Sequence, residues 1–310
     1  MRLSLRQLQI FIAIVESGST TAAAERIALS QSATSAALKE LESLLTTRLF
    51  DRVGKRLLLN DAGRALLPQA RWVLDGAQGI ESQFGASTET IASRLRVGAS
   101  TTIGNYLMPG LIASFRDTHP DTQIAVNIGN TQDIAAAVAN FEVDLGLIEG
   151  PSHQPELKAT AWMRDELVIV CAPGYELAQH LPQEKLKSAH KVPLEVSLKS
   201  LGEAQWLLRE PGSGTREAVE QALRPHLHQL QADLQLGGTE AIKQAAAEGL
   251  GVTCLSRCVI EDFVTLGRLV VLNTALPPLT RRFYLIQHEK KYPSAGLERF
   301  IAHCLVSTPV

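Results

Sequence analysis

The first sixty residues contain three short segments in which apolar positions recur every three or four residues, the period of one helix face. The first begins with Leu5 and ends where residues 17–19, Ser-Gly-Ser, break the pattern, and an alanine-rich second segment covers residues 20–27. Ser30 is a favourable N-cap for the third, because its hydroxyl can accept from a free N–H of the first turn. The pattern predicts three packed helices, the third with a buried stripe formed by Ala33, Ala37, Leu41 and Leu44.

The opposite face of the third helix carries hydroxyl, amide and amino groups near its start. Such groups can bond base edges or phosphates in a DNA groove, and a helix N-terminus favours a nearby phosphate. A solvated face in an unrelated three-helix bundle would have the same composition. The candidate DNA-binding residues on this helix are Gln31, Ser32, Thr34, Ser35 and Lys39.

A basic hairpin is predicted directly after the third helix. Residues 48–59 contain several basic side chains, and Gly54 stands at a plausible tip. Basic side chains on such a wing would lie at the sugar-phosphate backbone, fixing orientation without reading sequence. The wing candidates for DNA binding are Arg52, Lys55 and Arg56.

A long amphipathic helix should follow the hairpin. Asn60 can cap a helix from Asp61 to about Ser87, and Pro68 is early enough to be tolerated as a kink. Its apolar positions alternate at spacings of four and three, which favours burial against a second copy in a two-fold dimer. Packing against its own domain is the alternative. The seam consists of Leu66, Ala70, Val73, Ala77, Ile80 and Phe84.

Beyond residue 94 short apolar runs alternate with helical stretches. Repeated strand-helix-strand units predict an α/β domain with a mainly parallel sheet. The predicted strands are residues 95–97, 124–126, 144–148, 167–170, 205–208, 234–236, 251–255, 269–272 and 283–286.

Composition and charge are those of an ordinary folded protein with a basic N-terminal end. The 310-residue chain is 45% hydrophobic and 20% charged, and the length favours two or three domains. Residues 1–64 hold nine Lys and Arg against six Asp and Glu, although the whole chain has a net charge of -2. Local basic charge suits a nucleic-acid-binding end. With no signal peptide or membrane-spanning run in the sequence, we expect a cytoplasmic protein that does not enter a membrane.

At this point the N-terminal motifs support a family resemblance. The string Leu-Arg-Gln-Leu-Gln-Ile-Phe at 5–11, the alanine helix at 22–24, Leu-Ser-Gln-Ser-Ala at 29–33 and Arg-Leu-Phe-Asp-Arg at 48–52 resemble the LysR-type regulator signature in order and spacing. In that family the segment is a winged helix-turn-helix. The resemblance implies a DNA-binding transcription regulator with double-stranded promoter DNA as partner, and RNA polymerase as a second partner if the protein is an activator.

The resemblance also implies the domain organisation and the fold class. We expect an α/β protein with an N-terminal all-α winged helix-turn-helix and a two-subdomain sensing domain that is similar to periplasmic binding proteins. The family also has a dimerising linker helix, so self-association as a dimer or tetramer is expected. The implied domains are 1–60 for DNA binding, 61–90 for the linker helix and 94–310 for sensing, with subdomain one at 94–164 and 268–310 and subdomain two at 165–267.

Three loops are candidates for an effector site between the subdomains. Ligands of parallel α/β sheets bind at the carboxyl ends of strands, where helix N-termini converge. The loops offer hydroxyls, backbone N–H groups and one forked cation, Arg216, which together suit a small anion. A turn with an N-cap would also explain the Gly-Ser-Gly-Thr string. The candidate effector residues are Ser100, Thr101, Thr102, Asn130, Thr131, Gly212, Ser213, Gly214, Thr215 and Arg216.

The loop at 209–216 looks like that of a LysR subgroup that includes regulators of carbon fixation and of sulfite and sulfur assimilation. The N-terminal string is most similar to the sulfite-responsive members, so sulfite is the suspected effector, while phosphorylated metabolites or carboxylates would suit the same groups. Glu149, at the end of a predicted strand, is also expected to line the cleft. Its carboxylate would disfavour an anion unless it is paired, and a bridge to a basic group would make it a sensor of closure.

Other functions receive less support. No metal-binding or catalytic motif occurs, so neither an enzyme, nor a metal site, nor a cofactor is expected. An exported solute-binding protein would need an export signal and would have no use for residues 1–90. Cys254 and Cys258, four residues apart, leave open a thiol-based redox sensor, although the sequence around them has no basic cluster that would lower a thiol pKa.

Overall fold

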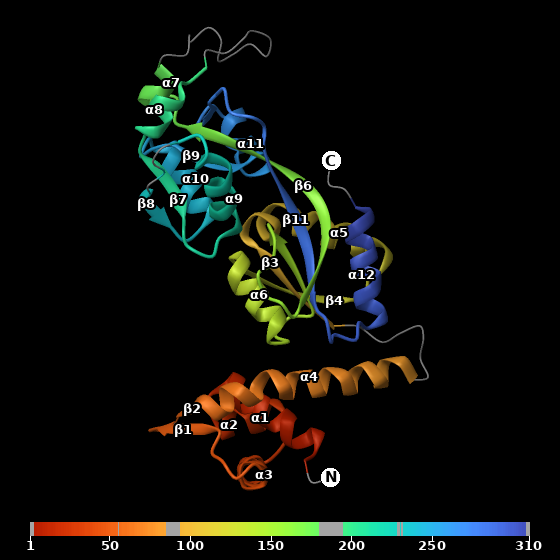
Figure 1. Ribbon diagram of the computed structural model, residues 1–310. Helices are drawn as coiled ribbons and strands as arrows, with labels where there is room; N and C mark the ends of the chain where they lie inside the picture. The colour runs from red at the N-terminus through yellow and green to blue at the C-terminus, as the bar shows by residue number, and fades with distance from the viewer. Residues whose placement is uncertain are drawn as a thin grey trace.

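A computed structural model describes residues 3–54, 56–84, 94–179, 195–227, 230 and 232–307. A small N-terminal head is followed by one long helix, and the larger C-terminal part lies beyond that helix (Figure 1). Within the described residues, no helix combines the length and apolar character that a membrane span requires.

Three helices form the head, as the periodicity predicts. They are α1 (Leu5–Ser17), α2 (Thr20–Arg26) and α3 (Gln31–Leu44). Ser30 caps α3 by accepting from the Ala33 N–H, which confirms the predicted start of this helix. Phe11 and Ile14 lie at the centre of the core that the helices share.

The buried face of α3 differs from the predicted stripe. The inward residues are Thr34, Leu38 and Leu41, whereas Ala33 is exposed. The predicted stripe is confirmed at Leu41 and in part at Ala37, which packs against the same core, and it is wrong at Ala33. The longer Leu38 side chain fills the core better than an alanine does.

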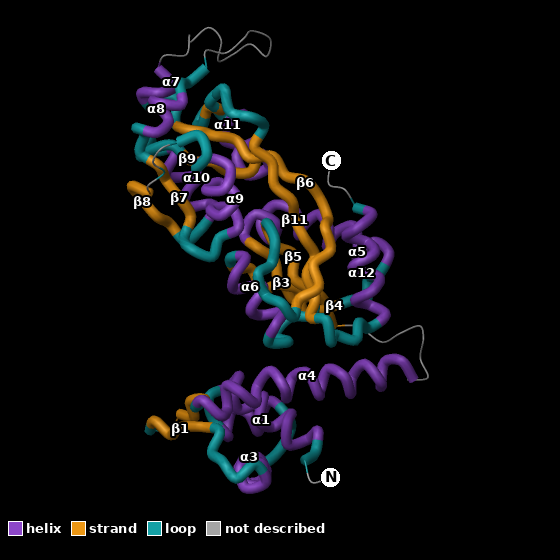
Figure 2. The backbone as a smooth tube through the Cα atoms, in the orientation of Figure 1, coloured by secondary structure: helices purple, strands orange, loops and turns teal. Residues whose placement is uncertain are grey.

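The wing is a two-stranded antiparallel hairpin of β1 (Phe50–Val53) and β2 (Arg56–Leu59), which projects beside the helices in Figure 2. Gly54 lies at its tip with φ of 61°, a left-handed conformation that glycine adopts without strain. The hairpin and its tip are confirmed.

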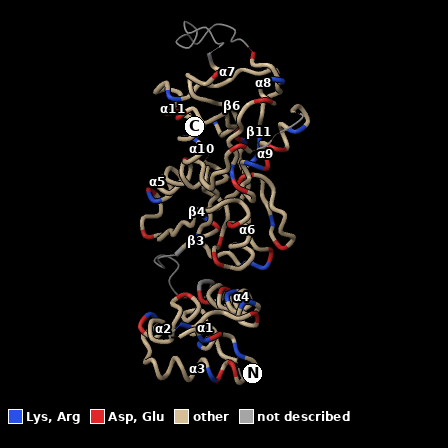
Figure 3. Tube along the Cα trace, turned by 90° about the vertical axis from the view of Figure 1, so that its left-hand side faces the viewer, with Lys and Arg blue, Asp and Glu red and all other residues tan. Residues whose placement is uncertain are grey.

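The linker helix α4 (Asp61–Phe84) begins at the predicted cap, where Asn60 Oδ1 accepts from the Gly63 N–H at 2.9 Å. The first part of the predicted seam packs on the head, since Ala70 is buried there. The later part stays uncovered, because Val73 and Ile80 are exposed. Acidic and basic positions both occur along this helix (Figure 3). The helix thus packs on the head along its first part and leaves Val73 and Ile80 exposed in its later part.

The part of the sensing domain nearest α4 is an α/β layer. Strand β3 (Arg94–Ser100) pairs in parallel with β4 (Gln123–Gly129) and β5 (Leu145–Glu149). Figure 1 shows helices on both faces of this sheet. The helical elements are the π-helix η1 (Ile103–Leu107), α5 (Met108–Thr118), α6 (Thr131–Ala139) and α12 (Ala295–Val306).

Two long strands, β6 (Leu157–Cys171) and β11 (Leu279–His288), run from this layer into a second one (Figure 1). They pair with each other antiparallel, and β11 also pairs antiparallel with β5. The prediction of a mainly parallel sheet is therefore wrong at the centre, because two crossing strands must run in opposite directions to leave a subdomain and return. The predicted boundary after residue 164 falls inside β6 and stays a prediction.

The second layer contains the remaining elements, and each predicted strand segment overlaps an observed strand. Strands β7 (Trp206–Arg209) and β8 (Ala232–Leu236) are parallel neighbours. The other elements are α7 (Glu176–Gln179), α8 (Leu198–Gly202), α9 (Gly214–Leu223), α10 (Thr239–Ala247), β9 (Thr253–Ser256), α11 (Arg257–Thr265) and β10 (Val270–Val271). The two layers confirm the expected two-subdomain fold and bring strand ends from both subdomains face to face.

Candidate effector site and DNA-binding surface

The start of α3 presents polar side chains to solvent. Gln31, Ser32 and Lys39 are exposed and Ser35 is half-buried. Gln31 Nε2 donates to Thr20 Oγ1 at 3.2 Å, a contact that orients the amide at the start of the helix. Four of the five predicted groove residues are therefore accessible.

Thr34 is the exception and corrects the prediction. Its side chain is fully buried, and its hydroxyl donates to the Ser30 carbonyl at 3.1 Å. A threonine in this position stabilises the first turn of α3 and has no access to DNA in this conformation.

The structure shows the exposure of two of the three basic side chains predicted for the wing. Arg52 on β1 and Arg56 on β2 are exposed near the hairpin tip. The third candidate, Lys55, lies outside the described residues. Two of the three cations are thus available to a phosphate backbone.

An ion-pair network closes the centre of the sensing domain. Glu149, at the end of β5, accepts from Arg281 Nη1 at 2.6 Å, from Thr215 Oγ1 at 2.6 Å and from the Thr102 N–H at 2.8 Å. Arg281 also donates from Nε to Asp165 at 2.7 Å. Since Thr215 lies on α9, the Glu149 carboxylate joins the two subdomains.

Burial alone would raise the pKa of Glu149, but Arg281 and the hydrogen bonds from Thr215 and Thr102 lower it below its usual value. Burial alone would lower the pKa of Arg281. The negative charges of Glu149 and Asp165 outweigh the effect of burial and raise the pKa of Arg281 above its usual value. An unpaired Glu149 carboxylate would repel an anion bound nearby. Here the carboxylate is paired with Arg281.

A second set of contacts spans the cleft beside this network. Arg209, at the end of β7, donates from Nη1 to Thr101 Oγ1 at 2.8 Å and to Thr239 Oγ1 at 2.6 Å. Thr101 and Thr239 are also within 2.9 Å of each other, although they belong to different subdomains. The remaining guanidinium nitrogens of Arg209 donate to Glu210. Burial would raise the pKa of Glu210, and Arg209 lowers it below its usual value.

Two further features at this place provide hydrogen-bonding groups. Ser100 Oγ, at the end of β3, is buried and makes no hydrogen bond of ordinary geometry among the described residues, although it lies near enough to the Glu149 carboxylate to help lower the pKa of Glu149. The N-cap of α10 is Gly238, which has no side chain to bond the free N–H groups of the first turn. We call Ser100, Thr101, Arg209 and Thr239 the Arg209 cluster. It offers one guanidinium, three hydroxyls and an uncapped helix start.

The other two predicted loops approach each other closely. The Gln132 N–H donates to the Gly212 carbonyl at 3.1 Å, across the two subdomains. A Cβ on Gly214 would lie 1.8 Å from the Glu149 carbonyl oxygen, so only glycine allows this approach. Asn130 caps α6, Ser213 caps α9, and Thr131 donates to the Glu149 carbonyl at 3.3 Å. These residues hold the loops in place.

The Arg216 guanidinium is held by contacts with neighbouring residues of α9, β7 and β8, and its predicted effector role stays a prediction. Its guanidinium donates to Glu220 at 2.8 Å on the same helix, and to the Arg209 carbonyl and Gln235 at 2.9 and 2.8 Å. It braces α9 against β7 and β8, so its cation is not directed at the cleft. A helix places neighbouring residues about 100° apart, and here Thr215 takes the inward position.

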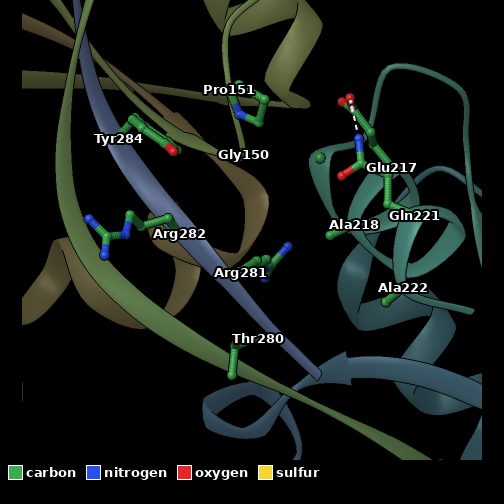
Figure 4. Close-up of a pocket in the computed structure, with 11 residues that line it drawn as sticks. Gly150, Pro151, Glu217, Ala218, Gln221, Ala222, Thr280, Arg281, Arg282 and Tyr284 are labelled. Atoms are coloured by element: carbon green, nitrogen blue, oxygen red, sulfur yellow. Dashed lines mark hydrogen bonds between the residues drawn. The ribbon is translucent and has the colours of Figure 1, made fainter. Parts of the chain in front are cut away.

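A separate pocket of about 290 Å³ lies between α9 and β11. Figure 4 shows Arg281 pointing toward α9, while Arg282 points away from it. Glu217 and Gln221 are joined by a 3.2 Å hydrogen bond on the α9 side. The pocket borders the Glu149–Arg281 network, and the third predicted loop reaches it through Gly214.

Sequence reasoning missed three central residues, Arg209, Thr239 and Arg281. Arg209 stands inside the quoted loop string but before its glycines, and Thr239 follows a Gly-Gly pair at the carboxyl end of β8, which is a detectable signal. Arg281 had no such signal, because the predicted strand started two residues later. No group of three or more metal-ligating side chains occurs in the described parts of the chain.

The cysteine pair does not have the environment of a reactive dithiol. Burial raises the pKa of Cys254 to about 12. Burial also raises the pKa of Cys258, although Ser256 lies within 3.1 Å of its sulfur and partly opposes the shift. A raised pKa keeps the thiol protonated and poorly nucleophilic.

Comparisons with known proteins agree with this architecture. A family model for bacterial regulatory helix-turn-helix proteins of the lysR family matches residues 5–64, and one for the LysR substrate binding domain matches residues 88–307. The chain is 44% identical over 304 residues to the uncharacterized HTH-type transcriptional regulator YeiE of Escherichia coli (strain K12), with 98% of both chains covered. It is 31% identical to the RuBisCO operon transcriptional regulator of Allochromatium vinosum, over 96% of this chain and 95% of that one. It is 30% identical to the HTH-type transcriptional regulator CysL of Bacillus subtilis (strain 168), over 95% and 94%.

Solved structures show the same fold. A full-length OxyR variant from Pseudomonas aeruginosa superposes with a TM-score of 0.79 at 21% identity, covering 99% of this chain and 96% of that one. The regulatory domain of Synechocystis CcmR in complex with 2-PG gives a TM-score of 0.59 at 27% identity, covering 69% of this chain and 96% of that one.

Proposed function

The chain belongs to the LysR family of transcriptional regulators, and on that basis we propose that it binds a small oxyanion, sulfite, at the Arg209 cluster and thereby controls promoter DNA binding. The observation that carries the proposal is the buried Arg209 guanidinium, which bonds hydroxyls from both subdomains at once. A ligand in this position touches both halves of the cleft.

The chemistry of the Arg209 cluster suits an oxyanion. Sulfite oxygens can accept charge-assisted hydrogen bonds from Arg209 and ordinary ones from Thr101 and Thr239. The buried Ser100 hydroxyl, which lies beside Glu149, and the N–H groups at the start of α10, which no side chain caps, would supply further donors. The nearby Glu149 is already neutralised by Arg281, so it does not repel the anion strongly.

The cleft is closed in this structure by direct protein contacts, and a ligand enters by replacing some of them. Thr101 and Thr239 bond each other, and their hydroxyls would turn to the anion. A ligand changes the closure equilibrium only by its differential affinity for the closed and open arrangements. An anion that bridges the two threonines favours closure and so provides that difference.

DNA binding by the head would use α3 in the major groove and the wing along the backbone. Gln31, Ser32 and Ser35 are the base-reading candidates on α3. Lys39, Arg52 and Arg56 supply the phosphate contacts. The exposed seam positions of α4, including Val73 and Ile80, support self-association as a dimer or tetramer, which would place two heads on a two-fold DNA site.

The test is calorimetric titration of the full-length protein at fixed ionic strength with sulfite, sulfate, thiosulfate, phosphate and small carboxylates. We expect saturable binding of sulfite, weakened at least tenfold, about 1.4 kcal/mol, by Arg209→Ala. Arg224→Ala is the matched control, because it removes an exposed guanidinium at the end of α9 that pairs with Glu220. Failure of every oxyanion to bind would overturn the effector assignment and leave family membership unaffected.

A further inference from the structure

The sensing domain holds the linker helix through four charged residues, the buried Asp75, Asp144 and Lys291 and the partly exposed Arg96, which we call the Asp75 junction. Asp75 on α4 binds Lys291 Nζ, and Arg96 Nη2 lies 4.0 Å from the same oxygen. Asp144 accepts from Lys291 Nζ at 2.9 Å and from Arg96 Nη2 at 2.6 Å. The side chains of Asp75, Asp144 and Lys291 are each 10% exposed or less.

Further contacts continue along the same face of α4. Arg71, one turn before Asp75, donates to Glu142 at 2.8 Å. Lys290 lies 5.9 Å from the ring centroid of Trp72. The contacts at positions 71, 72 and 75 are spaced as neighbours on one helix face. The junction therefore fixes the rotation of α4 about its own axis as well as its position.

Three neighbouring strands connect this junction to the cleft. Strands β11, β5 and β3 are consecutive in the sheet. Strand β3 carries Arg96 near one end and Ser100 at the other, and β5 is preceded by Asp144 and ends in Glu149. Each of these two strands therefore connects a residue of the Asp75 junction, Arg96 or Asp144, with a residue of the cleft, Ser100 or Glu149.

Strand β11 completes the pattern in the opposite direction. It carries Arg281 near its start, and Lys291 follows three residues after its end. Every residue of β5, the central strand of the three, is buried. A short, completely buried strand in a paired sheet moves as a unit, because close packing does not allow it to deform gradually.

One carboxylate oxygen of the Asp75 junction makes no hydrogen bond among the described residues. Asp75 Oδ2 is buried and has no hydrogen-bond partner in the described parts of the chain. An unpaired buried carboxylate oxygen penalises the docked state relative to one in which water reaches it. The docked position of α4 is thus balanced against an undocked one, and a small bias from the sensing domain can shift the balance.

We propose that the Asp75 junction is where the linker helix senses the state of the cleft: movement of Ser100, Glu149 and Arg281 on closure is carried by β3, β5 and β11 to Arg96, Asp144 and Lys291, which set the position of α4. This inference rests on the proposed function for the identity of the ligand. The junction residues do not touch the ligand and act as positioning residues.

The test measures distances by electron paramagnetic resonance between spin labels at Gln69→Cys on α4 and Arg299→Cys on α12, both exposed positions. The background carries Cys258→Ser, since the other three cysteines are buried. Labelled protein is diluted into an excess of unlabelled protein, so that distances within one chain dominate. We expect one main distance in the reference protein and, in Asp75→Asn, at least a tenfold rise in the population of a second distance.

The control is Glu81→Gln, which removes a carboxylate from an exposed position of the same helix and should leave the distance unchanged. The charge-reversed pair Asp75→Lys with Lys291→Asp should restore docking, because lysine at 75 can pair with Asp144. If Asp75→Asn does not fold, the charge-reversed variants test the junction instead. We then expect Asp75→Lys to lose the main distance and the double variant Asp75→Lys with Lys291→Asp to recover it. An unchanged distance in both single variants overturns the proposal.

Coupling to the cleft is tested without any ligand by Thr215→Val, which removes one bridge to Glu149. We expect it to shift the distance at α4, and a second label pair across the cleft verifies that the cleft has opened. An open cleft with an unmoved α4 overturns the coupling. With sulfite added, Asp75→Asn should retain the binding heat but lose the change in distance. Absence of sulfite binding to the reference protein would reject the proposed effector, while the two ligand-free measurements still decide the inference.

Discussion

Arg281 and Glu149 form an ion pair of 2.6 Å at the centre of the sensing domain, with no more than 3% of either side chain exposed. Arg281 reaches this position from a crossing strand, and Glu149 from the end of β5. Each charge is tolerated only because the other is present, since an unpaired buried ion is strongly unfavourable.

Glu149→Gln should lower the free energy of unfolding by about 3–5 kcal/mol, because it leaves Arg281 buried with one partner fewer. Urea unfolding followed by circular dichroism measures the change. Glu166→Gln is the control, as Glu166 pairs with Arg257 at the surface and its loss should cost less than about 1 kcal/mol. An equal loss of unfolding free energy in Glu149→Gln and Glu166→Gln would contradict the larger stabilisation that we assign to the buried ion pair.

Low pH should remove the contribution of Glu149 to the free energy of unfolding. Burial opposes its ionisation, but Arg281 and the hydrogen bonds lower its pKa below the ordinary value of 4.5. A lowered pKa in the folded state means that the stabilisation is complete above about pH 4.5 and is lost as the pH falls through the folded value. The stability difference between the natural protein and Glu149→Gln should therefore shrink in acid. A difference that grows below pH 4.5 would refute the assigned direction.

Gly214→Ala should hold the cleft open. The added methyl group would lie 1.8 Å from the Glu149 carbonyl oxygen, so α9 must retreat from β5. We expect sulfite affinity to fall about tenfold or more, equivalent to about 1.4 kcal/mol, by calorimetry. Gly202→Ala is the control, since a methyl group there meets no atom within 4 Å.

The wing arginines should contribute to DNA affinity without sequence preference. Arg52→Ala and Arg56→Ala should each reduce the slope of log affinity against log salt by about 0.9, the value for one lost phosphate contact. Gln31→Ala should instead relax base preference on DNA selected in vitro. Thr34→Val should leave base preference unchanged, because Thr34 is buried. If Thr34→Val changed the base preference as much as Gln31→Ala does, Thr34 would have to contact DNA after all.

The thiols should not mediate a peroxide response. Burial raises the pKa of Cys254 to about 12 and also raises that of Cys258, so little thiolate forms near neutral pH. We expect DNA binding by Cys258→Ser to match that of the natural protein before and after peroxide treatment. Loss of a peroxide effect in this variant alone would restore the redox interpretation.

Local signals in the sequence predicted much of the fold. Ser30 and Asn60 cap the helices they were expected to cap, since an N-cap depends on a few adjacent residues. The stripe of α3 was wrong at Ala33 because its small and polar residues, such as Ala33 and Thr34, leave the helix phase poorly defined. The strand positions were predictable from apolar runs, but the direction of β6 and β11 depends on where the chain must travel between subdomains.

The candidate site was harder to predict than the fold. The sequence singled out the loop at 209–216 and named Arg216, whereas our proposal uses Arg209. The contacts of Arg209 with Thr101 and Thr239, and of Arg216 with Glu220, arise only in the folded chain. The partner of Glu149 was equally inaccessible, since Arg281 is more than a hundred residues away. Pairings of that kind arise from tertiary packing.

The length of α4 turns a small tilt at the sensing domain into a displacement on DNA. About fifteen residues separate Asp75 from the end of the wing strand β2, which at 1.5 Å per residue gives a lever of about 22 Å. A tilt of about 10° at Asp75 would therefore move the head by about 4 Å, close to the rise of about 3.4 Å between base pairs along one strand. Since the first half of α4 is packed on the head, the head must follow the helix. Under the proposed coupling, a single helix would convert a small tilt at Asp75 into a shift of about one base-pair step at the promoter.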